Sequence, residues 1–162
     1  LFPQMTVQAN IGYGLKLRGA SAQQLKQTVG ELIDLVQLRG LEHKRPSELS
    51  GGQRQALTLL MASWLKPDLL LLDEHTAALD PKSADKVIRL TQEIVERDKL
   101  TTLIVTHSMT QAVNLGDRIL MMHKGRLLHD IAGSERQRIT AGDLRERFEE
   151  AGRREVDSAA ND

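Results

Sequence analysis

Two short apolar segments that flank a helical pattern constrain the fold of this chain most. Leu69–Leu72 is an unbroken run of leucines, and Thr102–Thr106 is a second apolar segment. Between them, Asp80-Pro81 opens a helix whose apolar residues recur at helical spacing. Strands that alternate with helices predict an α/β layered fold with parallel strands. The continuous leucine run is typical of a strand that is covered on both faces.

The rest of the chain carries helix and hairpin signals. Serine or threonine caps precede most of the helical patterns, and we expect the first helix to end near Gly12 and Gly14. On these signals we predict helices over 7–11, 21–40, 50–64, 108–115 and 140–150, and a hairpin around Lys124-Gly125.

Composition excludes several classes of protein. The 162 residues include 22 basic and 22 acidic side chains, so the formal net charge is zero, which argues against a nucleic-acid binder steered by basic charge. Without cysteine, the chain has neither disulfides nor thiolate metal ligands. No apolar run approaches the roughly 18 residues that a membrane span requires.

Leu49-Ser50-Gly51-Gly52-Gln53 places a hydroxyl and two glycines at the start of a predicted helix. Backbone amides at a helix N-terminus lack intrahelical partners and favour an anion. Glycine would let a phosphate approach the backbone, and Ser50 and Gln53 would add hydrogen bonds. The alternative for this segment taken alone is an ordinary serine-capped helix.

Acidic and histidine residues follow the two apolar segments. Asp73-Glu74 comes directly after the leucine run, where α/β sheets place ligands. Asp73 suits a magnesium ion, and Glu74 suits the activation of water. The alternative is a solvated acidic turn. His107 follows the second strand; a lone histidine there is more often structural, and we interpret His75, His123 and His129 as structural.

Taken together, these segments strongly resemble the ABC-type ATPase family. Leu49–Gln53 matches its LSGGQ signature, Leu69–Glu74 its Walker B strand, Ala77–Asp80 its D-loop and His107 its H-loop. The likeness covers nearly all of residues 1–130. It implies a P-loop NTPase-like layered fold with a helical subdomain over about 15–65. We expect a polar helical extension over 131–155 and a disordered tail over 156–162.

The resemblance also implies roles for individual residues. Ser50, Gly51, Gly52 and Gln53 would bind ATP held by an opposite subunit, and Asp80 would lie at the interface of a head-to-tail dimer. Asp73 would hold Mg²⁺, directly or through water. Glu74 would polarise the attacking water, and His107 would contact the γ-phosphate.

Two departures from the family pattern stand out. No G-x-x-x-x-G-K-[ST] motif occurs in the 162 residues, so we expect an N-terminally truncated chain that lacks the Walker A portion and has little activity alone. His75 stands where the family usually has proline. His75 and Thr76–Pro81 resemble importers of amino-acid-like solutes, whereas residues 1–48 resemble the sugar and polyamine branch.

The function implied is ATP hydrolysis that drives solute import, on the cytoplasmic face of the bacterial inner membrane. The implied partners are transmembrane permease subunits, a second ATP-binding subunit and an extracytoplasmic solute-binding protein, with no nucleic acid. In the family, the segment over 15–48 contacts the permease. The alternatives are a truncated, inactive ABC chain and an ABC-type DNA-maintenance ATPase, which the lack of a coiled coil and of a basic stripe disfavours.

Overall fold

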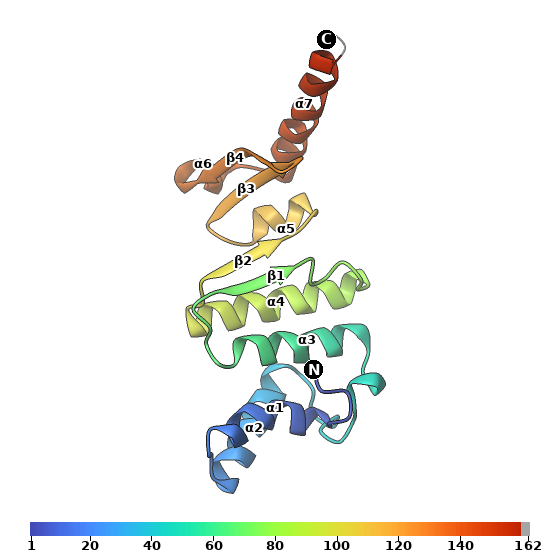
Figure 1. Ribbon diagram of the computed structural model, residues 1–162, viewed down its shortest axis with the longest axis vertical. Helices are drawn as coiled ribbons and strands as arrows, with labels where there is room; N and C mark the ends of the chain where they lie inside the picture. Colours follow the sequence, from blue (N-terminus) through green and yellow to red (C-terminus); the bar gives the residue numbers. More distant parts are fainter. Residues whose placement is uncertain (160–162) are drawn as a thin grey trace. The chain divides into compact units, whose positions relative to one another are not determined.

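The computed structural model describes residues 1–159 and separates into two compact units. The first unit covers Leu1–Ile104 and the second begins at Val105. Their elements are labelled in Figure 1. The boundary between the two units lies near the end of the second predicted strand.

The first unit is a group of helices followed by a β–α–β unit (Figure 1). Its elements in chain order are α1 (Val7–Leu17), α2 (Ala22–Leu35), the 3₁₀ helix η1 (Pro46–Glu48), α3 (Gly51–Ser63), β1 (Leu70–Asp73), α4 (Pro81–Asp98) and β2 (Thr102–Val105), where β2 ends at the boundary of the unit. β1 and β2 are hydrogen-bonded neighbours that run in the same direction and are joined through α4 (Figure 1). The predicted β–α–β crossover is therefore confirmed.

The core of the first unit lies where α3 and α4 pack together and cover β1. α3 buries Leu57 and Leu60, α4 buries Ile94, and β1 adds Leu70 and Leu72. All of these side chains are less than a tenth exposed. α3 contacts both α1 and α4. It thereby connects the group of helices at the start of this unit to the β–α–β unit that follows.

α1 continues through Gly12 and Gly14 to Leu17, so the prediction that it ends near these glycines is wrong. Thr6 caps it as expected, accepting a hydrogen bond from the Ala9 amide. Gly12 is buried, and a Cβ built there would lie 3.4 Å from both Leu25 and Val29 of α2. Packing against α2 therefore outweighs the low helix propensity of glycine.

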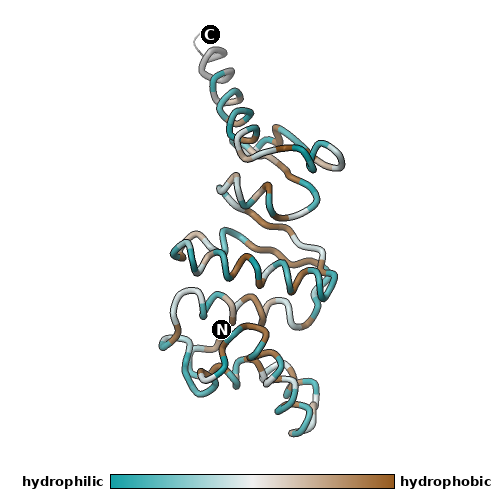
Figure 2. Tube along the Cα trace, turned by 180° about the vertical axis from the view of Figure 1, so that it is seen from behind, coloured by the Kyte–Doolittle hydropathy of each residue, from teal (hydrophilic) through white to brown (hydrophobic). Residues whose placement is uncertain are grey.

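The expectation that β1 is covered on both faces is also wrong. Leu70 and Leu72 are buried, but Leu71 is 64% exposed and Leu103 of β2 is 49% exposed. Figure 2 shows both strands as apolar stretches, whereas α4 mixes polar and apolar residues. Because α4 covers only one face, the apolar side chains that point to the other face remain exposed.

The second unit is built around a β-hairpin. Its elements are α5 (Met109–Asn114), β3 (Arg118–His123), β4 (Arg126–Ala132), α6 (Gly133–Arg138) and α7 (Ala141–Ala159). β3 and β4 pair antiparallel, with Ile119 opposite Ile131. Lys124 and Gly125 both have positive φ angles, as a two-residue hairpin turn requires. The predicted hairpin is confirmed.

α7 packs its apolar side on the hairpin. Leu144 is 1% exposed and lies in a cluster with Ile119 and Ile131. Thr140 and Asp143 form the expected reciprocal cap. The helix continues past residue 155 to Ala159, which includes part of the predicted tail; residues 160–162 of that tail lie outside the described residues.

The division into an ATPase portion over 1–130 and an extension over 131–155 stays a prediction, as does the helical subdomain over about 15–65. Within residues 1–159, no helix combines the length and the apolar character that crossing a membrane requires.

We predict that Leu71→Thr combined with Leu103→Thr reduces self-association of this chain without destabilising it. Both side chains are exposed on the apolar sheet face, so little packing is lost, and the change in unfolding free energy should stay within about 0.5 kcal/mol. Light scattering and denaturant unfolding measure the two effects.

Leu72→Thr is the matched control, because Leu72 is 8% exposed and lies in the core. It should cost about 2 kcal/mol through lost packing and a buried hydroxyl. Equal stability of the Leu71 and Leu72 variants would contradict the one-sided burial of β1.

Candidate functional site

The signature segment forms the start of α3. The Ser50 hydroxyl accepts a hydrogen bond from the Gln53 amide (3.3 Å), and the Gln53 side-chain oxygen accepts one from the Ser50 amide (2.9 Å). This reciprocal pair is a capping box, which explains why the helix begins at Gly51. The Ser50 hydroxyl proton and the Gln53 side-chain NH₂ take no part in it, so both remain available as donors.

Gly51 and Gly52 lie against the segment that begins α4. A Cβ built on Gly51 would lie 3.2 Å from Leu79, and one built on Gly52 would lie 3.0 Å from the Cβ of Ser83. A Cβ at position 52 would therefore require Ser83 of α4 to shift. The close approach at Gly52 exists before any ligand is considered, whereas at Gly51 the neighbour is the flexible end of the Leu79 side chain.

Asp80 caps α4, and the packing of Gly51 and Gly52 brings it into the neighbourhood of the signature segment. Its Oδ1 accepts a hydrogen bond from the Ser83 amide (3.1 Å), and Pro81 occupies the first helical position. Hydrogen bonds from Ser83 lower the pKa of Asp80 from its ordinary value of 3.8. Asp80 is therefore ionised at neutral pH. The sequence suggested these two segments separately, and the structure places them together.

The acidic pair lies at the carboxyl end of β1. Asp73 is the last residue of the strand, and both Asp73 and Glu74 are exposed. Glu74 has a φ of 42°, in the left-handed region. The Ala77 amide donates to the Glu74 carbonyl (3.0 Å), so the chain turns immediately after the pair.

His75 has the structural role that was predicted for it. Its Nε2 lies 3.1 Å from the Thr91 hydroxyl of α4, and Thr91 is 1% exposed. Burial lowers the pKa of His75 below its ordinary value of 6.5, so the imidazole is neutral at neutral pH. The sequence signal that could have revealed this pair is Thr91, a polar residue that interrupts the apolar side of α4.

His107 belongs to the second unit, in the segment that leads into α5. The residues on each side of it form a local turn, because the Thr106 hydroxyl accepts from the Ser108 amide (3.1 Å) and donates to Gln111 (3.1 Å). His107 itself is exposed. Its predicted action together with Glu74 stays a prediction.

The donor set fits magnesium only in part. In the portion of the chain that the structure describes, no three histidine or acidic side chains gather as metal ligands. Mg²⁺, however, is commonly held by one or two carboxylates together with substrate phosphates and water. Asp73 therefore fits an ion that arrives with a nucleotide. The exposed start of α3 fits the anionic phosphates, because its amides and dipole favour negative charge.

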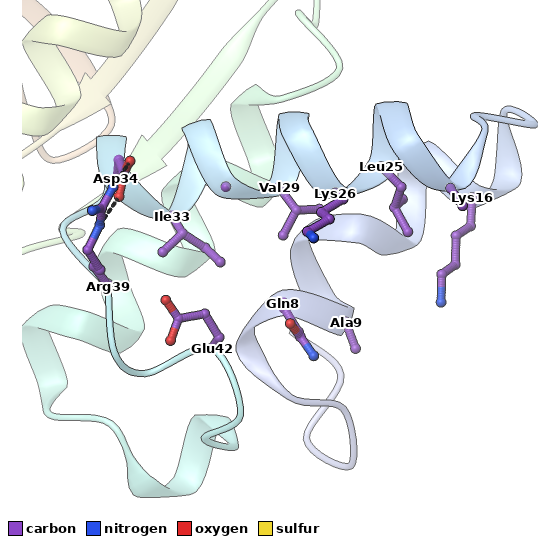
Figure 3. Close-up of a pocket in the computed structure, with 12 residues that line it drawn as sticks. Gln8, Ala9, Lys16, Leu25, Lys26, Val29, Ile33, Asp34, Arg39 and Glu42 are labelled. Atoms are coloured by element: carbon purple, nitrogen blue, oxygen red, sulfur yellow. Dashed lines mark hydrogen bonds and ion pairs between the residues drawn. The ribbon is translucent and has the colours of Figure 1, made fainter.

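A groove of about 530 Å³ lies between α1, α2 and the turn at residues 39–42 (Figure 3). Its apolar lining comes mainly from Leu25, Val29 and Ile33 of α2. The sequence did not predict this groove. Most of its lining residues nevertheless lie in the segment over 15–48, which the family resemblance implies contacts the permease.

The charges that line this groove differ between its two ends. Lys16 lies at one end and Lys26 lies near the middle, beside Val29 (Figure 3), and neither lysine forms an ion pair within residues 1–159. At the other end, Arg39 is paired with Asp34 through its Nε (2.7 Å), which lowers the pKa of Asp34. Glu42 also lies there and accepts the Gly40 amide (3.0 Å). One end is therefore basic and the other carries Glu42.

Comparison with known proteins identifies the class to which this fold and site belong. Residues 1–77 match the family described as ABC transporter. This match includes the signature segment and the acidic pair. The chain belongs to the ABC transporter ATP-binding family, and its mixed helix and strand architecture has the P-loop NTPase-like fold of that family, as predicted.

Several relatives are transport ATP-binding proteins. A tyrosine transport ATP-binding protein of Clostridioides difficile is 41% identical over 157 residues, which cover 92% of this chain and 62% of that protein. A sulfate/thiosulfate import ATP-binding protein of Mesorhizobium japonicum is 46% identical over 78% of this chain and 38% of its own length. An Fe(3+) ions import ATP-binding protein of Pasteurella multocida is 37% identical over 83% of this chain. This chain spans less than two thirds of each relative.

We predict that Gly52→Ala destabilises the chain by about 1–2 kcal/mol, because its new methyl group meets the Cβ of Ser83. Adding Ser83→Gly should restore much of that loss, whereas adding Ser83→Ala should not, since alanine keeps the Cβ. Denaturant unfolding of the single and double variants measures this coupling.

Gly30→Ala on α2 is the control, because no atom lies within 4 Å of the Cβ built there. It should raise stability by about 0.5–1 kcal/mol. If Gly52→Ala were equally harmless, the close approach of α3 and α4 would be wrong.

Proposed function

We propose that this chain is the signature-bearing and Walker B-bearing part of the ATP-hydrolysing subunit of an ABC importer. The observation that carries this proposal is the packing of the Ser50–Gln53 segment against the turn that ends in Asp80. Two segments that are separate in sequence thereby form one exposed surface, on which serine and glutamine donors remain available. A surface of this kind suits the phosphates of a nucleotide held by another subunit.

The capping box supports the roles proposed for the signature residues. Because the Gln53 oxygen and the Ser50 oxygen accept from each other's backbone amides, the donors that remain are the Gln53 NH₂ and the Ser50 hydroxyl. Both would donate to the γ-phosphate of ATP in the opposite subunit, and Gly51 and Gly52 would bring the helix start close to it. Asp80 would contact that second subunit in a head-to-tail dimer.

Further roles in the reaction are proposed for the acidic pair of the first unit and, separately, for His107 of the second unit. Asp73 would hold Mg²⁺, which neutralises charge on the phosphate oxygens when it is bound. Glu74 would orient and polarise the attacking water, and His107 would donate to the γ-phosphate. Stabilisation of the charge that develops on the phosphoryl oxygens is the main demand on such a site.

ATP hydrolysis tests this proposal directly. The chain alone should hydrolyse little ATP, because no G-x-x-x-x-G-K-[ST] motif occurs in its 162 residues. When it is joined to the N-terminal segment of the Clostridioides difficile relative, turnover should appear, and Glu74→Gln should lower it by about 100-fold or more.

Glu93→Gln on the exposed side of α4 is the matched control and should leave turnover unchanged. Turnover by the chain alone would contradict the proposed need for a phosphate loop. If the joined protein were inactive, the alternative of an inactive ABC chain would replace this proposal.

The proposed partners are permease subunits, a second ATP-binding subunit and an extracytoplasmic solute-binding protein, at the cytoplasmic face of the inner membrane. An amino-acid-like solute is the favoured cargo, because the tyrosine transport relative aligns over 92% of this chain. We assign permease contact to the groove between α1 and α2.

The lining of the groove specifies the helix that it would accept. The partly exposed side chain of Leu25 and the small exposed parts of Val29 and Ile33 suit an apolar stripe on a partner helix. Lys16 at one end and Lys26 near the middle favour acidic residues on that half of the helix, and Glu42 favours a basic residue at the other end. A permease helix with opposite charges at its two ends therefore fits this groove.

Two synthetic helical peptides with the same apolar stripe test the assignment. A peptide with one acidic end and one basic end should bind about threefold more tightly than one that is basic at both ends. Lys16→Glu combined with Lys26→Glu should reverse this preference in a fluorescence anisotropy titration.

Lys82→Glu combined with Lys86→Glu is the control, because it makes the same change in charge on the exposed side of α4. It should leave the preference as it is in the unmodified chain. An equal effect of both double variants would indicate net charge rather than the groove.

A further inference from the structure

The backbone of Glu74 has a conformation that its own sequence does not favour. Its φ of 42° lies in the left-handed region, which is unfavourable for a residue with a Cβ. Two consecutive turns follow, because the Ala77 amide donates to the Glu74 carbonyl (3.0 Å) and the Leu79 amide donates to the Thr76 carbonyl (3.1 Å). Contacts elsewhere in the fold must therefore hold this conformation.

His75 supplies a contact between this turn and α4. Its Nε2 lies 3.1 Å from the Thr91 hydroxyl, which in turn donates to the Val87 carbonyl (2.8 Å). Since the hydroxyl proton is used in that second bond, the Thr91 oxygen accepts from Nε2–H. Val87 and Thr91 are both less than 3% exposed, so the acceptor is fixed inside the core.

We propose that His75 is a positioning residue, which anchors the turn after β1 to Thr91 of α4 and thereby holds Glu74 at the carboxyl end of the strand. Thr76, which is 5% exposed, anchors the next position. Two inward-facing residues thus follow an exposed carboxylate. The proposal rests on the proposed function only for the consequence in catalysis, since the anchoring itself concerns this chain alone.

Histidine holds the turn through a side-chain bond, whereas a proline at this position would act on the backbone through its ring. A proline fixes its own φ and restricts the residue before it. His75 does neither. The conformation of the turn therefore depends on the hydrogen bond between His75 Nε2–H and the Thr91 oxygen. Removal of that oxygen should therefore release Glu74 without disturbing the apolar contacts of α4.

Thr91→Val and Thr91→Ser form the matched pair of variants. Valine keeps the shape of the side chain and removes the hydroxyl, whereas serine keeps the hydroxyl. In this chain, hydrogen exchange of the Ala77 amide should be at least tenfold faster in Thr91→Val and His75→Ala, and unchanged in Thr91→Ser. Heteronuclear NMR of the unmodified chain should show the Nε2–H form of His75.

Thr58→Val on α3 controls for the loss of a hydroxyl bond within a helix, because the Thr58 hydroxyl donates to the Arg54 carbonyl (2.9 Å) and has no histidine partner. It should leave the exchange of Ala77 unchanged. The proposal is overturned if Thr91→Val leaves that exchange unchanged, if Thr91→Ser accelerates it equally, or if the amides of α3 lose protection to the same extent.

Turnover in the joined protein described above provides the catalytic readout. Thr91→Val should lower kcat about tenfold with the KM for ATP unchanged, and Thr91→Ser should restore it. Unchanged kcat in Thr91→Val overturns the catalytic consequence. If even the unmodified joined protein is inactive, the proposed function fails, and the exchange of Ala77 alone decides the anchoring by His75.

Discussion

The start of α3 lies close against the start of α4 at positions 51 and 52, which carry no side chains. A Cβ at either position would come within 3.2 Å of Leu79 or Ser83. This close approach aligns α3 with α4, and the two helices then bury Leu57, Leu60 and Ile94 between them and β1. The core of the first unit and the surface formed by Ser50–Gln53 and Asp80 therefore depend on the same contact.

The same contact changes how the glycines of the signature are understood. Glycine beside a phosphate-binding segment is usually explained by the approach of the ligand. Here Gly52 already lies close against Ser83 within the chain, and Gly51 lies against the flexible end of the Leu79 side chain. In the proposed site, the contacts to the ligand would come instead from Ser50 and Gln53, whose capping box uses their oxygens and leaves their donors. A serine-capped helix and an anion site, which the sequence left as alternatives, are thus compatible descriptions of the same four residues.

Local signals predicted most of the elements because their causes are local. Thr6, Ser21, Ser50 and Thr140 each accept a hydrogen bond at the start of a helix, as capping residues do. Predictions failed where distant contacts decide the outcome. α1 passes through Gly12 because Leu25 and Val29 pack against it, and β1 exposes Leu71 because α4 covers only one face of the strand. Neither contact can be inferred from a window of neighbouring residues.

The same distinction holds for the candidate site. Motif spacing predicts which residues belong to it, whereas packing decides the backbone conformation of those residues. Motif spacing identified Asp73, Glu74 and Asp80, but the left-handed backbone of Glu74 has no local signal such as a glycine. That conformation depends on α4, through the bond from His75 to Thr91, which lies sixteen residues after it in the sequence. A buried threonine on an apolar helix face is unfavourable unless its hydroxyl has partners. Thr91 meets this requirement with Val87 and His75, so the polar residue that interrupts the apolar stripe of α4 is also the one that links this helix to the acidic turn.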